Sequence, residues 1–169
     1  MHEVPGILQR CKALLLDWLF ISAYLSLLAA AASALYFLAW GGIPSMTAGQ
    51  AQLTAALTSV VPVTAMFSAL EGRGRRASFG KQRSGLAVVY TGSPSMGSII
   101  RNVLKFAPWQ LGHMSTINGI YHGFDTPLSV ICLTLSVLLA GTYLAMAFGR
   151  RDGRHLADMI AGSRVVRGS

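Results

Sequence analysis

The chain has 169 residues, of which 53% are hydrophobic and only 12% are charged. Soluble globular chains carry about 25% charged residues, and disordered chains combine low hydrophobicity with high charge. The composition therefore disfavours both classes and points to a membrane protein.

Three stretches are long and apolar enough to predict membrane-spanning helices, which need about 20 residues each. They cover about residues 13–40, 52–70 and 128–148. No charged residue occurs between Asp17 and Glu71, so this part of the chain holds two spans and a glycine-rich turn. Pro62 falls within the second span, where a neighbouring helix should satisfy the carbonyl group that proline leaves free.

The distribution of basic residues predicts a fourth crossing. All 14 Lys and Arg residues lie within residues 10–12, 73–105 and 150–167. Because such residues favour the cytoplasmic side, the chain must cross once more between the second and third clusters. The candidate is a polar helix at about 97–121, with Arg101 and Lys105 on a stripe that would face the other helices. The alternative is an interfacial helix followed by a re-entrant loop.

These patterns predict an all-α membrane protein, a single domain over residues 1–169 with about four transmembrane helices. Both termini would lie in the cytoplasm. A C-terminal amphipathic helix ending at Gly162 should place Leu156, Met159 and Ile160 opposite Arg154 and Asp158. The β-prone segments 84–90 and 163–166 should pair as a small cytoplasmic ribbon.

The usual motifs for catalysis and cofactor binding are not recognisable. The glycine-rich loop at 74–81 has the wrong spacing for a phosphate loop, and Gln82 replaces the residue that would bind magnesium. His113 and His122 have no matching Cys or carboxylate cluster for a metal. We therefore expect no enzyme activity, cofactor or metal. The basic loops should contact anionic lipid headgroups rather than nucleic acid.

Ionisable residues near or within the spans are the candidate site. Asp17 lies inside the first span, where a carboxylate needs a partner. Arg10 lies on nearly the same helix face, but Arg101 or Lys105 from the polar helix would be a better partner. Asp158 should join this cluster. The chemistry of this cluster fits either a static ion-pair network or proton and cation exchange. The polar helix at about 97–121 also carries Asn102 and His113.

Four segments in this order resemble the RDD family of bacterial membrane proteins. They are residues 10–17 (RCKALLLD), 78–89 (SFGKQRSGLAVV), 101–113 (RNVLKFAPWQLGH) and 154–166 (RHLADMIAGSRVV). The resemblance places the arginine of the family name at Arg10 and its two aspartates at Asp17 and Asp158. Ser163 departs from the threonine more often found there. The resemblance implies a multi-span inner-membrane protein with a proposed role in transport of cations or protons.

Two functions follow as alternatives. The first is a small transporter or exchanger that uses the Arg/Asp cluster and acts as an oligomer, because four helices barely enclose a path. The second is a non-catalytic accessory or assembly subunit of a larger membrane complex. The second is favoured by the small-residue stretch from Ala29 to Ala34 in the first span, which suits close helix packing.

Overall fold

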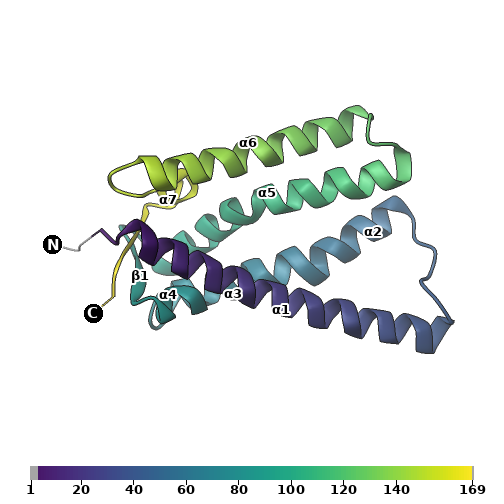
Figure 1. Cartoon of the computed structure of the whole chain (residues 1–169), viewed down its shortest axis with the longest axis horizontal. Helices are drawn as coiled ribbons and strands as arrows, with labels where there is room; N and C mark the ends of the chain where they lie inside the picture. The colour runs from purple at the N-terminus through teal and green to yellow at the C-terminus, as the bar shows by residue number, and fades with distance from the viewer. Residues whose placement is uncertain (1–3, 169) are drawn as a thin grey trace.

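Long helices run side by side along the molecule in the computed structural model, which describes residues 4–168 (Figure 1). They are α1 (Ile7–Trp40), a segment formed by α2 (Ala48–Ala55), the π-helix η1 (Ala56–Val60) and α3 (Val61–Gly72), then α5 (Pro94–His122) and α6 (Pro127–Gly149). The shorter elements are α4 (Phe79–Arg83), β1 (Leu86–Tyr90), α7 (Leu156–Ile160) and β2 (Ser163–Arg167).

Among the described residues, three helices are long and apolar enough to cross a membrane. They are α1, the segment from α2 to α3, and α6, each slightly longer than the span predicted from the sequence. Most side chains of α1 and α6 are exposed in the isolated chain, as expected for surfaces that face lipid, whereas the segment from α2 to α3 is more covered.

The polar helix α5 is continuous over 29 residues and contains no re-entrant loop. Its polar stripe faces the other helices, as predicted: Arg101 and Ser115 are buried. Ile99 and Val103, on the other side, are about half exposed. Polar side chains of α5 therefore face the other helices and apolar side chains face outward, a distribution that suits a membrane rather than water.

Proline residues lie within two of the long helical segments, and each leaves a backbone carbonyl free that a tyrosine from a neighbouring helix binds. Pro62 has no N–H for the carbonyl of Thr58, which instead accepts a hydrogen bond of 2.6 Å from the hydroxyl of Tyr24 in α1. In α5, Pro108 frees the carbonyl of Leu104, and the hydroxyl of Tyr143 in α6 donates to it at 3.0 Å. The carbonyl groups that proline leaves free thus form specific contacts between helices.

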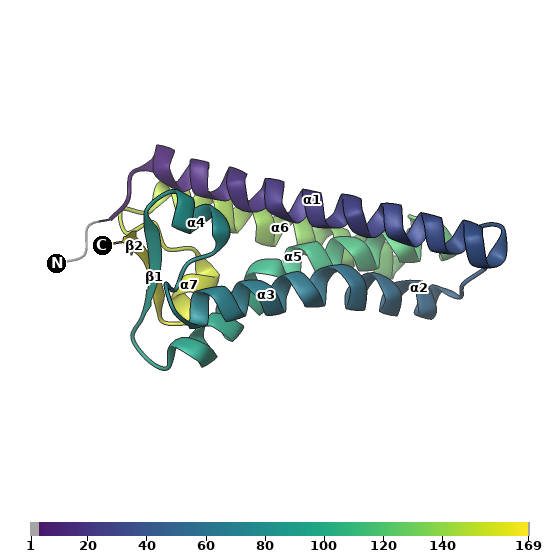
Figure 2. The same ribbon diagram turned by 90° about the horizontal axis from the view of Figure 1, so that it is seen from below.

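Both termini, α4, α7 and the two strands gather at one end of the bundle, which we call the charged end (Figures 1 and 2). The strands are antiparallel, with Leu86 opposite Arg167 and Tyr90 opposite Ser163. This confirms the predicted ribbon of 84–90 with 163–166. All three clusters of basic residues lie on elements at or near this end.

The helix α7 differs from its prediction. It has five residues and ends at Ile160 rather than at Gly162. Asp158 is buried, whereas Met159 and Ile160 are exposed, so the aspartate side of α7 faces the protein. The physical reason is that the Asp158 carboxylate finds basic and hydroxyl partners inside the protein.

The bundle core is small and lies where α3 meets α5. Its buried members are Val60, Val63, Phe67 and Phe106. By contrast, α1 has its most extensive contact with the short helix α4, while its Ile21 and Tyr24 pack against the edge of this core. Much of the contact that positions α1 therefore lies at the charged end.

Candidate functional site

Asp17 is buried in α1 and binds the loop and helix that follow α3. The hydroxyl of Ser78 donates to its Oδ2 at 2.6 Å, and the backbone N–H of Gly80 donates to its Oδ1 at 2.7 Å. Lys81 Nζ is more distant, 3.8 Å from Oδ2. The expectation that Arg101 or Lys105 is the partner of Asp17 is wrong, because α4 folds back onto α1 and supplies nearer donors.

Glu71, at the end of α3, is the centre of the network and is fully buried. Its Oε1 accepts a hydrogen bond from Lys81 Nζ at 2.7 Å. Its Oε2 accepts from the guanidinium of Arg101 and, at 3.1 Å, from the amide of Asn102. From the sequence, Glu71 marks only the end of an uncharged stretch, and Lys81 belongs to a basic loop that is expected to contact lipid headgroups.

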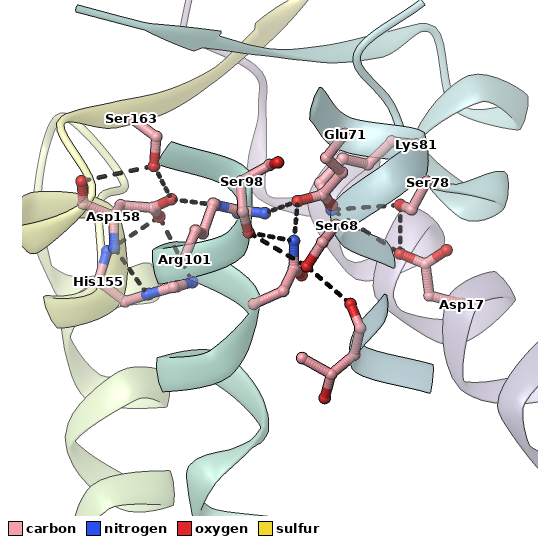
Figure 3. Close-up of polar contacts among 12 residues, drawn as sticks. Asp17, Ser68, Glu71, Ser78, Lys81, Ser98, Arg101, His155, Asp158 and Ser163 are labelled. Atoms are coloured by element: carbon pink, nitrogen blue, oxygen red, sulfur yellow. Dashed lines mark hydrogen bonds and ion pairs between the residues drawn. The ribbon is translucent and has the colours of Figure 1, made fainter. Parts of the chain in front are cut away.

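Arg101 connects Glu71 to Asp158, so that one chain of contacts crosses the charged end (Figure 3). Its Nε donates to Asp158 Oδ1 at 2.6 Å, and Ser163 Oγ donates to the same oxygen at 2.9 Å. We call Asp17, Ser78, Lys81, Glu71, Arg101 and Asp158 the ion-pair network. It joins α1, α3, α4, α5 and α7, which are far apart in the sequence.

Arg10 and Lys105 lie beside the network rather than in it. Arg10 donates from Nε to the carbonyl of Pro5 at 3.0 Å and from Nη1 to the carbonyl of Ala147 at 2.9 Å. We expect Arg10 beside the carboxylates, but in the structure its guanidinium joins α1 to α6 instead. Lys105 Nζ lies 4.5 Å from the ring centroid of Phe67 and 4.9 Å from that of Phe106.

The two other polar-helix residues have separate roles. Asn102 is fully buried and joins the network through Glu71. His113 lies further along α5, away from the network. Its Nε2 accepts a hydrogen bond from the indole N–H of Trp109 at 3.1 Å. The structure does not bring His113 into contact with the ion pairs.

A cavity of about 400 Å³ lies next to the network, between α1 on one side and α5 and α6 on the other. Its charged lining consists of Arg10, Asp17, Lys81, Arg101, Lys105 and Asp158, together with His155. The remaining lining is largely apolar, with Trp109, Leu144 and Phe148 among its residues. The site therefore combines an ionic wall with an apolar space.

A family comparison agrees with this arrangement. The model of the RDD family matches residues 4–162, nearly the whole chain. The chain belongs to the RDD family. Searches of curated proteins and of solved structures find no match. The RDD match covers Asp17, Glu71, Arg101 and Asp158, so the whole ion-pair network lies in the family region.

In this RDD protein, the side chain of His155 caps the N-terminus of α7. His155 Nδ1 accepts a hydrogen bond from the backbone N–H of Asp158, and the backbone N–H of His155 donates to the Asp158 carboxylate, both at 3.4 Å. Burial lowers the pKa of His155 from 6.5 to about 4, although Asp158 opposes this shift. For Asp158, burial raises the pKa, but Arg101 and His155 lower it more.

Acidification is therefore expected to destabilise the protein. The unfolded chain takes up a proton at His155 near pH 6.5, whereas the folded chain resists protonation until about pH 4. The contribution of His155 to the free energy of unfolding is thus fully present well above pH 6.5, and it falls by about 2 kcal/mol between pH 7 and pH 5. Unfolding of the detergent-solubilised protein, followed against pH, measures this loss.

Two variants isolate the effect of His155. His155→Asn keeps an oxygen that can cap α7 but does not titrate, so the decline between pH 7 and pH 5 should flatten. His122→Asn, at an exposed histidine at the end of α5, should keep the wild-type decline. An unchanged pH profile for His155→Asn would assign the decline to other groups.

Proposed function

We propose that this RDD protein is a single domain that crosses the bacterial inner membrane four times, with the charged end in the cytoplasm. The three apolar helices account for three crossings. The fourth is α5, which runs beside α6 and, at 29 residues, is about 43 Å long. With four crossings, both termini and every cluster of basic residues lie on the side that basic residues favour.

Within this topology, the function that the site supports best is exchange of protons or small cations at Asp17. The supporting observation is that Asp17 is the most weakly paired buried carboxylate of the network, and it lines the cavity. Its ammonium partner, Lys81, is 3.8 Å away, whereas Glu71 and Asp158 hold basic groups at 2.7 and 2.6 Å or closer. A proton or cation can therefore compete for Asp17 at the lowest electrostatic cost.

The packing of α1 supplies a way for such binding to cause movement. Because the contact of α1 with α4 is its most extensive one, neutralising Asp17 would weaken the attachment of α1 at the charged end. Lys81 would remain paired with Glu71. Binding at Asp17 would thus loosen α1 from α4, while the ion pairs between α3, α5 and α7 and the contact of Tyr24 with Thr58 stay in place.

Flux in liposomes tests this function. The purified protein is reconstituted, and internal pH is followed under sodium, potassium or proton gradients. Asp17→Asn should reduce the flux to that of empty liposomes, because the amide cannot carry the exchanged charge. Asp152→Asn is the matched control, since it removes a carboxylate from an exposed pair with Arg150 and should keep the flux. A fully active Asp17→Asn variant would contradict the proposal.

A non-catalytic accessory role in a larger membrane complex is the second candidate. It is supported by a groove of about 720 Å³ between α3 and α5, lined by small side chains such as Ala65, Ala69 and Gly72. Small residues let helices approach closely in membranes, so the groove could receive a helix of a partner subunit or of another copy. Folded wild-type protein that carries no flux under any gradient would favour this role.

A further inference from the structure

The cavity beside the ion-pair network carries more positive than negative charge. Four basic side chains line it, and two carboxylates face them. The fully buried Glu71 behind the wall adds a third carboxylate through its bonds with Lys81 and Arg101. One positive charge is therefore left over, since His155 is neutral at pH 7.

Like Arg10, whose guanidinium donates to the backbone carbonyls of Pro5 and Ala147, Lys105 is a basic residue of the cavity without an acidic partner. Among the described residues, no carboxylate lies within ion-pair distance of its ammonium group. Its contacts with the rings of Phe67 and Phe106 offset only part of the cost of removing an ammonium group from water. An anion in the cavity would complete the pairing of Lys105.

The other side of the cavity is suited to hydrocarbon. Leu14 of α1 and Leu144 and Phe148 of α6 line it. Each is also about half exposed. The cavity is therefore open on its apolar side, between two helices that are apolar enough to span the membrane.

From this combination we infer that the cavity binds an acidic phospholipid. Its phosphate would pair with Lys105 next to Arg10, and its acyl chains would lie along the apolar surface between α1 and α6. A free phosphate would make no use of the apolar walls, and a neutral hydrocarbon would leave Lys105 unpaired. The inference does not depend on ion flux at Asp17.

Quenching of Trp109 fluorescence by brominated lipids tests the site, because this indole lines the cavity. Trp18 and Trp40, which are 61% and 63% exposed, are replaced by phenylalanine so that Trp109 is the only reporter. The protein is reconstituted in phosphatidylcholine, and brominated phosphatidylglycerol or brominated phosphatidylcholine is added. We expect half-maximal quenching at about fivefold less of the acidic lipid, the preference typical of one basic residue.

Two pairs of variants distinguish lipid binding in the cavity from non-specific attraction of acidic lipid to the basic surface. Lys105→Met should abolish the preference, whereas Lys12→Met, at an exposed lysine of α1, should keep it. Ala140→Phe should fill the cavity without changing charge and abolish the preference as well. Its control, Ala145→Phe, places the same ring at an exposed position of α6 and should bind normally. If Lys105→Met fails to fold, the Ala140 pair still decides the result.

Three results would overturn the inference. The first is equal quenching by acidic and zwitterionic lipid in the wild type. The second is retention of the preference in folded Lys105→Met or Ala140→Phe. The third is relief of quenching by inorganic phosphate at constant ionic strength, which would assign the site to a soluble anion instead of a lipid.

Discussion

Replacing Glu71 by glutamine is expected to lower the free energy of unfolding by about 3–5 kcal/mol, the usual cost of breaking a buried ion pair. The side chain is fully buried and accepts hydrogen bonds from Lys81, Arg101 and Asn102. Glutamine fills the same space but carries no charge, and its NH₂ group points a donor at other donors. Two basic groups would then share the remaining carboxylates.

The measurement is reversible unfolding of the detergent-solubilised variant, with helix content as the signal. Asp152→Asn is again the matched control, because its pair with Arg150 is exposed and such pairs contribute little. A Glu71→Gln variant as stable as this control would show that the network does not hold the charged end together. Arg101→Gln should resemble Glu71→Gln, since it leaves Glu71 and Asp158 without their shared partner.

The long elements could be predicted from local sequence properties. The spans follow from hydropathy alone, and the spacing of Arg101 and Ser115 on α5 places both on the buried face. The ribbon follows from β-branched residues after glycine and serine. The signal for each helix and each strand is contained within one segment of the chain, and the pairing of the two strands follows from the expectation that both segments lie on the same side of the membrane.

The partners within the site could not be predicted in this way. Ser78 and Asp17 are 61 positions apart, and hydropathy does not tell which helices are neighbours. The five-residue helix α4 is too short to produce a periodic pattern, although it supplies both Gly80 and Lys81. One available signal was overlooked: Glu71 is an acid in the last turn of a span that leads into a basic loop, and an acid at such a position needs a base.

Substitution of Gly80 by alanine is expected to separate α1 from α4. A Cβ atom at this position would overlap the backbone oxygen of Ala13 and lie 2.8 Å from the backbone nitrogen of Asp17. Neither backbone atom can move without moving α1, so the overpacking should cost about 1–3 kcal/mol. The displacement would also lengthen the hydrogen bond from Gly80 to the Asp17 carboxylate.

Unfolding measurements and hydrogen exchange of the first turns of α1 test this prediction. The control is Gly141→Ala in α6, where a Cβ atom would meet nothing within 4 Å. Alanine favours helix formation, so this variant should be as stable as the wild type or more so. Slow exchange in α1 of Gly80→Ala would mean that the helix is held by other contacts. Fast exchange would support the proposal that Asp17 controls α1, because a neutral Asp17 and a displaced Gly80 would then release the helix at the same contact.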